Sequence, residues 1–320
     1  MGALFFWRRL SGVSAAPGWL AVDLDGPVAR LAHVIPNGAQ ATVEFAEERE
    51  WDPAEPKSLE RVAKEFGAKR YRCTTLLKPS EYNILLVEAP AVKADELKAA
   101  VRWRIKDMLD YHVDDATIDV LDVPVPPGPA QQRARYMYTV AARNDTVRAT
   151  IDRFTAGGLP LEVIDIPDTA QRNIATHFER EGRGAVMLSF DAHGGLVTVT
   201  HAGELYLSRR LDITAEQFAT EDEESRARLL DRVLVETQRS LDHCERTYSF
   251  FALGRVVIAP LPGASLLREH LAANLYLPVE VLELSEVLSL PPEADDWTGD
   301  DQAQWLKVLG AGLRVEKKAL

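Results

Sequence analysis

The sequence predicts a mixed α/β fold in two lobes. Along almost the whole chain, short apolar segments rich in β-branched residues alternate with segments whose apolar residues recur every three or four positions. The chain has 320 residues, of which 46% are hydrophobic and 27% are charged. This is an ordinary globular composition, and the length suffices for one bilobal unit or two domains.

Three short strands open the chain. They are punctuated by Gly and Pro and cover residues 18–26, 28–36 and 40–48. A helix is expected over 52–67, with Asp52 as its N-cap and Gly67 at its end. The apolar residues of this helix share one face and are Leu59, Val62 and Phe66.

The next segment predicts a strand, a helix and two paired strands. The strand covers 82–90, and the helix covers 92–111. Apolar residues fall every four positions on one face of this helix, at Leu97, Val101, Ile105 and Leu109. The paired strands over 115–126 and 133–142 are separated by a loop rich in Pro and Gly.

The remainder continues the alternation. A helix from about Asp145 to Thr155 and a strand over 159–167 lead into a helix that begins at Pro167. The second half opens with a hairpin over 184–210, after the turn sequence "REGRG". The long helix that follows has an apolar face made of Leu230, Val233, Leu234, Leu241, Cys244 and Tyr248. A strand, a helix, a strand, a solvated loop and a final helix are expected over 254–260, 262–275, 277–284, 289–300 and 301–315.

Charge and motif content exclude several function classes. A net charge of -12 disfavours a nucleic-acid partner, because binding to a phosphate backbone depends on clustered positive charge. Cys73 and Cys244 lie far apart without metal-ligand spacing, which indicates buried thiols. The seven histidines show no HExxH spacing, and the loops of Ser hydrolases, P-loop ATPases and Rossmann enzymes are missing. We therefore expect no metal site and no catalytic residues of these classes.

The N-terminal segment bears on localisation. No run of about 18 apolar residues occurs, and "MGALFFWRRLSG" carries its charges after its apolar stretch, the reverse of a secretory signal. The chain is expected to stay in the cytoplasm. Phe5, Phe6 and Trp7 beside Arg8 and Arg9 could form an interfacial anchor on anionic lipid. A disordered leader, or one that packs on its own fold, is the alternative.

Three motifs, in order, resemble the actin-like superfamily. "WLAVDLDGPVARLAHV" is similar to the first phosphate loop, "AVMLSFDAHGGLVTVTHAGELYLSRRLDI" to the second, and "RVVIAPLPGASLLREHLAANLYLPVEVLEL" to the adenosine strand, turn and helix. Within that superfamily, "YNILLVEAPAVKADELKAAVRWRIKDMLDYHVDDATIDVLDVP" and "QRSLDHCERTYS" resemble the family of the type IV pilus assembly protein PilM and, more specifically, the MSHA-pilus biogenesis protein MshI. The resemblance covers the chain from about Gly18 to Arg314.

The resemblance implies a two-lobed actin-like (ribonuclease H-like) α/β fold with a small α/β subdomain inserted in the first lobe. The leader, for which membrane-surface contact is one of the two alternatives above, covers residues 1–16. Lobe I covers 17–182 with its insert at about 81–143, and lobe II covers 183–300. The C-terminal helix of residues 301–320 is expected to return to lobe I.

The resemblance also implies a function. A family member is a cytoplasmic scaffold, peripheral to the inner membrane, that organises a pilus assembly platform together with the platform's other components. It binds the cytoplasmic N-terminal peptide of a PilN-like single-span membrane protein. Two other functions stay open. One is an active actin-like ATPase in which ATP and Mg²⁺ control assembly, and the other is an adaptor for an unrelated membrane or signalling partner.

The first phosphate loop departs from the implied pattern. Asp23 keeps the strand position, but Asp25 follows it, and Gly26 and Pro27 come next. A carboxylate at this point repels a triphosphate unless Mg²⁺ lies between them, and proline removes an N–H donor.

The second loop and the adenosine turn depart as well. The family's strand aspartate falls on Ser189, and Asp191 stands two positions later, roughly 6.6 Å along the strand. At the adenosine turn, only Gly263 keeps the required backbone freedom. We expect ATP hydrolysis to be lost, without ATP or Mg²⁺ as cofactors. The degenerate remnant of the nucleotide site comprises Asp23, Asp25, Gly26, Asp191, Gly194, Gly195 and Gly263. The alternative is that these are ordinary turn residues.

A partner site is predicted on the helix of the insert. Trp103, Arg104 and Lys106 flank the buried-face positions Val101 and Ile105, so they should point away from the helix's apolar stripe. An aromatic ring between two cations suits a short peptide. The alternative is that Trp103 packs against the neighbouring strand pair while both cations are solvated.

Overall fold

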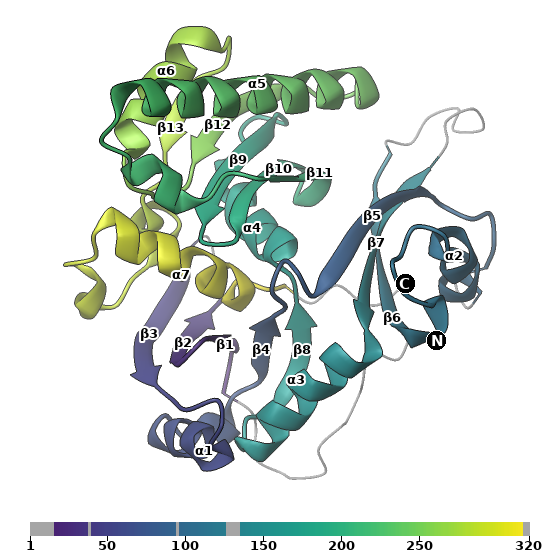
Figure 1. Cartoon of the computed structure of the whole chain (residues 1–320), viewed down its shortest axis with the longest axis vertical. Coiled ribbons are helices and arrows are strands. Elements are labelled where there is room, and N and C mark those ends of the chain that lie inside the picture. Colours follow the sequence, from purple (N-terminus) through teal and green to yellow (C-terminus); the bar gives the residue numbers. More distant parts are fainter. Residues whose placement is uncertain (1–15, 38–39, 94–95, 126–134, 316–320) are drawn as a thin grey trace. The chain divides into compact units, whose positions relative to one another are not determined.

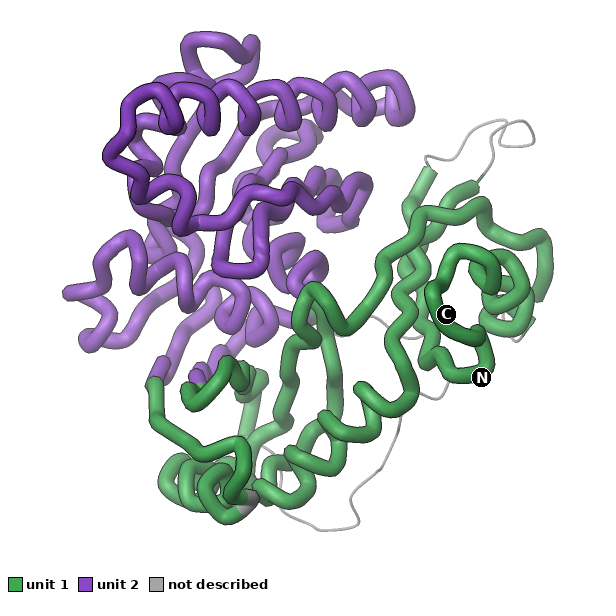
Figure 2. The backbone as a smooth tube through the Cα atoms, in the orientation of Figure 1, with its two compact units in different colours: residues 1–29, 48–166, 315–320 green, residues 30–47, 167–314 purple. Residues whose placement is uncertain are grey.

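The computed structural model divides the chain into two compact units (Figures 1 and 2). It describes residues 16–37, 40–93, 96–125 and 135–315, so the predicted leader lies almost wholly outside the described residues. Unit 1 comprises residues 1–29, 48–166 and 315–320, and unit 2 comprises residues 30–47 and 167–314. The boundaries between these units differ from the predicted boundaries between the lobes, which stay a prediction.

The first sheet has the strand order β14-β3-β2-β1-β4-β8. Its strands are β1 (Trp19–Asp25), β2 (Val28–Ile35), β3 (Ala41–Glu50), β4 (Cys73–Leu76), β8 (Leu161–Asp165) and β14 (Leu288–Ser289). Within unit 1, β1 pairs with β4 and β4 pairs with β8, all parallel. Trp19 to Val22 of β1 are all buried, as expected for a strand covered on both faces. The three predicted opening strands are confirmed.

Helices α1 (Pro56–Glu65) and α3 (Asn144–Ala156) belong to unit 1. The predicted N-cap of the first helix is wrong, because the helix begins four residues after Asp52 with Glu55 as its N-cap. Pro56 stands in the first helical turn, where its missing N–H costs nothing. Asp52 instead accepts the Ala54 N–H at 2.8 Å through Oδ1, an Asx turn that precedes the helix.

The predicted insert is present in unit 1. It contains β5 (Tyr82–Glu88), α2 (Leu97–Ile105), β6 (Ala116–Val123) and β7 (Tyr136–Arg143), and its sheet has the antiparallel order β5-β7-β6. Helix α2 lies on one face of this sheet (Figure 1), and Val101 and Ile105 are fully buried against it. Leu97 and Leu109 pack partly buried on the same cluster, which confirms the four-residue stripe.

The sheet of unit 2 has the order β11-β10-β9-β12-β13. Its strands are β9 (Gly184–Asp191), β10 (Gly194–His201), β11 (Glu204–Leu211), β12 (Leu253–Ile258) and β13 (Val279–Val281). Strands β9, β10 and β11 form an antiparallel meander, whereas β12 runs parallel to β9 and β13 runs parallel to β12. The hairpin predicted from the sequence is therefore the β9–β10–β11 meander.

The helices of unit 2 are α4 (Pro167–Ala175), α5 (Glu223–Thr247), α6 (Ala264–Asn274) and α7 (Gly299–Gly312). The predicted face of the long helix is shifted by one position at its start, because Leu229 is buried and Leu230 is half-buried. Thr237 and Ser240 also lie buried in this face, and each hydroxyl donates to a carbonyl of its own helix. Burial raises the pKa of the Cys244 thiol to about 12, which fits a structural thiol.

The segment predicted as a solvated loop, residues 289–300, is partly packed. The Trp297 ring stacks on the Trp305 ring of α7 with centroids 5.4 Å apart, and Ala294 is buried. In the part of the chain that the structure describes, no helix combines the length and the apolar character needed to span a membrane.

Helices α4 and α7 approach each other closely at Gly310. A Cβ atom on Gly310 would lie 2.3 Å from the carbonyl oxygen of Ala170, so only glycine fits there without movement of the backbone. The Gly310 carbonyl also accepts the Asn173 side-chain amide at 2.8 Å. A small residue at this position therefore sets the spacing of the two helices.

Replacing Gly310 by alanine should destabilise the protein, because one helix must move to make room for the methyl group. We expect a loss of about 1–3 kcal/mol in the free energy of unfolding, measured by urea denaturation. Gly299→Ala on the same helix is the matched control, since a Cβ atom there meets nothing within 4 Å. Equal stability of the two variants would contradict this close packing.

Candidate functional site

The first candidate hairpin is the β1–β2 turn of unit 1. Asp25 ends β1, and Gly26 has a φ of 56°, a conformation that glycine adopts without strain. The Lys78 ammonium lies 3.1 Å from Asp25 Oδ1, and the two side chains are 41% and 48% exposed. Asp23, two positions earlier on the strand, is half-buried. The turn carboxylate that sequence analysis expected to repel a triphosphate is thus neutralised by a lysine of the same unit.

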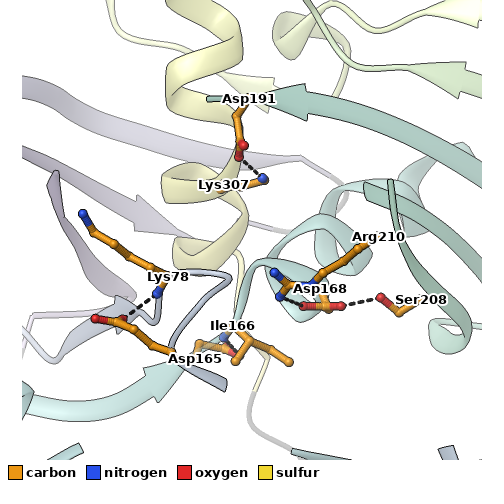
Figure 3. Close-up of polar contacts among 9 residues, drawn as sticks. Lys78, Asp165, Ile166, Asp168, Asp191, Ser208, Arg210 and Lys307 are labelled. Atoms are coloured by element: carbon orange, nitrogen blue, oxygen red, sulfur yellow. Dashed lines mark hydrogen bonds and ion pairs between the residues drawn. The ribbon is translucent and has the colours of Figure 1, made fainter. Parts of the chain in front are cut away.

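The second candidate hairpin is the β9–β10 turn of unit 2, where Asp191 ends β9. Asp191 Oδ1 accepts the His193 N–H at 2.7 Å, and Oδ2 pairs with the ammonium of Lys307 on α7 (Figure 3). The pair is largely screened from solvent, since the lysine side chain is 17% exposed and the aspartate side chain is 29% exposed. Sequence analysis missed Lys307, which lies 116 residues from Asp191.

Close packing explains why both residues of this turn, Gly194 and Gly195, are glycines. Gly194 has a φ of 130°, and a Cβ atom there would lie 2.9 Å from the Leu211 carbonyl oxygen. A Cβ atom on Gly195 would lie 2.8 Å from the Phe190 ring. The hairpin therefore needs both glycines for its own geometry, whether or not it holds a phosphate.

Ser189 occupies the strand position at which the resembled pattern has aspartate. It is buried, and its hydroxyl donates to Gln171 Oε1 on α4. Gln171 Nε2 in turn lies 3.0 Å from the Met187 carbonyl, 3.2 Å from the Leu196 carbonyl and 3.0 Å from Thr198 Oγ1. The polar group at this position is thus committed to the interior of unit 2.

Sequence analysis also missed Gln171, although a signal existed. Gln171 falls in register with Ile174, Ala175 and Phe178, at the spacing of one helical face. A polar residue inside an apolar stripe predicts a buried group with specific partners. All four residues are buried.

A further buried carboxylate stands at the start of α4. Asp168 is fully buried, accepts the hydroxyl of Ser208, and lies 3.7 Å from the Arg210 guanidinium (Figure 3). It stands in the first turn of α4. These contacts tie α4 to the edge strand β11, which indicates a structural role.

Gly263 begins α6 as its N-cap with a φ of 73°. A Cβ atom there would lie 3.8 Å from the nearest backbone oxygen, so the left-handed backbone, not crowding, favours glycine. Leu261 beside it is buried, and its carbonyl accepts the Ala264 N–H at 3.2 Å. The turn is therefore a compact helix start.

These residues match poorly with Mg²⁺ and a nucleotide. Mg²⁺ is held through carboxylates and phosphate oxygens, and an ammonium paired with a carboxylate competes with Mg²⁺ for it, more strongly in a covered pair than in one that water screens. Both turn carboxylates, Asp25 and Asp191, are paired in this way. Over the described ranges, no group of three or more His, Cys, Asp or Glu side chains is placed to hold a metal ion.

The residues predicted to bind a partner are exposed on α2. Trp103 is 72% exposed, and the Lys106 ammonium lies 5.1 Å from the centroid of its ring. Arg104 lies 3.8 Å from the Glu88 carboxylate, and both side chains are about half exposed. The three side chains therefore point away from the apolar stripe, and Trp103 does not bury itself on the strand pair. Their binding role stays a prediction.

Comparisons with known proteins give structural matches. No protein-family model and no curated protein matches the chain. A chain of the solved "PilM-PilN type IV pilus biogenesis complex" matches with a TM-score of 0.69 at 18% identity, covering 94% of this chain and 98% of that chain.

Two weaker structural matches are the cytoplasmic domain of EpsL and a protein of unknown function with an actin-like ATPase fold. EpsL is an inner-membrane component of the type II secretion system of Vibrio cholerae, and its TM-score is 0.44 at 14% identity, with 91% and 94% of the two chains covered. The protein of unknown function is from Bacteroides thetaiotaomicron, and its TM-score is 0.48 at 10% identity, with 88% and 96% covered. The predicted actin-like α/β fold is confirmed, and it includes the small inserted subdomain.

The paired carboxylates and the inward Ser189 predict weak nucleotide binding. Isothermal titration with Mg-ATP should show no dissociation constant tighter than roughly tens of micromolar. ADP in EDTA serves as the control for binding without metal. A submicromolar complex accompanied by phosphate release would show that the lysine pairs open to admit the nucleotide.

Proposed function

We propose that the chain is a scaffold of a type IV pilus assembly platform, of the MSHA type served by MshI. The observation that carries the proposal is the likeness of fold over 94% of this chain to a chain of a PilM-PilN complex. The likeness extends over 98% of that chain, so it spans both units and the insert. The motifs of the sequence support the same family independently.

The proposed partner is a PilN-like single-span inner-membrane protein, bound through its cytoplasmic N-terminal peptide. In this account the chain is cytoplasmic and lies against the inner membrane, where it contacts the other platform components. The basic and aromatic leader would add contact with the membrane surface.

The proposal includes a degenerate nucleotide site and no enzymatic activity. Its support is the state of three residues in the predicted phosphate loops. Asp25 is paired with Lys78, Asp191 is paired with Lys307, and Ser189 donates to Gln171 inside the fold. With these groups engaged, the hairpins serve as framework, and assembly needs no ATP cycle.

The proposed docking surface is the insert. Of the nine large hydrophobic side chains exposed in the described chain, five belong to it, namely Leu86, Val92, Trp103, Met108 and Tyr136. Trp103 supplies the largest apolar surface among them, and Lys106 and Arg104 flank it with positive charge. A Trp ring offers apolar contact to a peptide, and the neighbouring cations can bind the carboxylate or carbonyl oxygens of that peptide.

Trp103→Ala and Arg104→Glu should each weaken peptide binding by tenfold or more, because they remove the anchor ring or reverse a flanking charge. The probe is a labelled peptide from the cytoplasmic N-terminus of a single-span membrane protein encoded beside this chain, measured by fluorescence anisotropy. Tyr276→Ala is the matched control, since Tyr276 is 65% exposed but lies in unit 2.

All variants should melt at the parent's temperature. Unchanged affinity in both insert variants, with the fold intact, would move the peptide site off α2. Equal losses in the insert variants and in Tyr276→Ala would indicate binding without a defined site.

A further inference from the structure

Helix α1 carries a row of cations on its outer side. Lys57, Arg61 and Lys64 follow one another at the i, i+4 and i+7 spacing of one helical stripe, and all three are exposed. The opposite side of the helix is buried through Leu59 and Val62. Figure 1 shows α1 at one end of unit 1, so the row of cations faces outward from that unit.

The short turn after α1 enlarges this positive surface, because Lys69 and Arg70 are exposed as well. The Lys64 Nζ atom lies 2.7 Å from Glu60 Oε1. This contact lowers the pKa of the Glu60 carboxyl, and the charges of Lys69 and Lys57 lower it further. Three lysines therefore gather around one carboxylate. We call the surface made of Lys57, Arg61, Lys64, Lys69 and Arg70 the basic face.

The charge balance of this segment is opposite to that of the whole chain. Residues 56–72 contain six Lys and Arg and two Glu, a net charge of +4, whereas the chain has a net charge of -12. Residues 223–247, the long helix α5, contain five Arg and six Asp and Glu, so that helix has no positive excess. Positive charge is thus concentrated on the basic face, where it favours an anionic partner.

Ion pairs on the basic face leave its cations available. The Arg61 guanidinium lies 3.1 Å from the Glu55 carboxylate, and the two side chains are 66% and 47% exposed. Such a pair is worth little because water screens it, so a dense anionic surface can replace the carboxylate.

The leader joins the described chain beside the basic face. Ala16, the first described residue, donates its N–H to the Arg70 carbonyl oxygen at 2.9 Å. The aromatic residues of the leader, which end at Trp7, lie outside the described residues. An extended chain spans at most about 3.6 Å per residue, so Trp7 stays within about 32 Å of Ala16. The apolar segment and the basic face are therefore tied to the same end of unit 1.

We infer that the basic face is a docking surface for an anionic lipid membrane and acts together with the leader. The inference rests on the proposed place of the chain at the inner membrane, and it adds which face meets the lipid. A short apolar segment gives only weak, reversible attachment, and stable attachment takes a second signal such as a basic patch. Because the two signals are linked in one chain, they engage together and their contributions multiply.

The test is sedimentation of the full chain with vesicles of phosphatidylcholine that contain about 30% phosphatidylglycerol, at about 0.1 M salt. Each basic side chain near such a surface strengthens partitioning roughly fivefold. Lys57→Gln/Lys69→Gln should therefore lower the partition coefficient about tenfold or more. Deleting residues 2–10 should have an effect of about the same size, and the two changes together should abolish sedimentation.

Arg228→Gln/Arg239→Gln on α5 is the matched control, because it removes the same charge from two other exposed side chains. This control should sediment like the parent, and all variants should melt at the parent's temperature. Vesicles of pure phosphatidylcholine should bind the parent weakly. Salt at about 1 M, where the Debye length is about 3 Å, should release most of the parent from the anionic vesicles.

Two results would overturn the inference. One is equal sedimentation of the parent and Lys57→Gln/Lys69→Gln, whether or not the parent binds the vesicles. The other is an equal loss in the α5 control, which would indicate a response to net charge alone. Either result, with peptide binding by the parent intact in the anisotropy assay, rejects the membrane face and leaves the proposed scaffold standing. Absence of peptide binding by the parent would instead count against the proposed function.

Discussion

The buried amide of Gln171 holds the second hairpin to the body of unit 2. Its nitrogen lies within hydrogen-bond distance of two strand carbonyls, and its oxygen accepts the Ser189 hydroxyl. A buried amide without such partners would be strongly destabilising, so α4, β9 and β10 must keep this arrangement. The strand position at which the resembled pattern has aspartate is thereby committed to the interior of unit 2.

The aspartates of the two turns also have partners within the fold. Asp25 and Asp191 stand at the two predicted phosphate turns, and each is paired with a lysine from within its own unit. At the second turn, Gly194 and Gly195 are required by close packing of the hairpin itself.

Local patterns in the sequence predicted most of the elements. Residues spaced like Leu97 to Leu109 share one face of any α-helix, so the sequence predicts that this face packs on a core, as it does in the structure. The predicted start of the first helix at Asp52 is wrong, because the helix begins at Pro56 with Glu55 as its N-cap. Both Asp52 and Pro56 are adequate start signals in the sequence. Contacts between residues far apart in the chain could not be predicted from the sequence. No local pattern links Asp191 with a lysine 116 positions later, because only the packing of α7 brings them together.

The insert carries the surface that we propose for partner binding. It carries its own small core of Val87, Val101, Ile105, Ile118 and Met137, so α2 can present Trp103 to solvent without loss of packing. In the proposed scaffold, binding on this surface and order in the hairpins have separate physical origins. A scaffold built in this way should hold its partner regardless of nucleotide.

The central claim is that partner binding does not depend on nucleotide. The most direct measurement is the dissociation constant of the N-terminal peptide from the neighbouring single-span membrane protein, determined by calorimetry with and without saturating Mg-ATP. The account predicts binding with the same dissociation constant in both conditions. Absence of peptide binding, or a change of about tenfold or more, equivalent to about 1.4 kcal/mol, would contradict it.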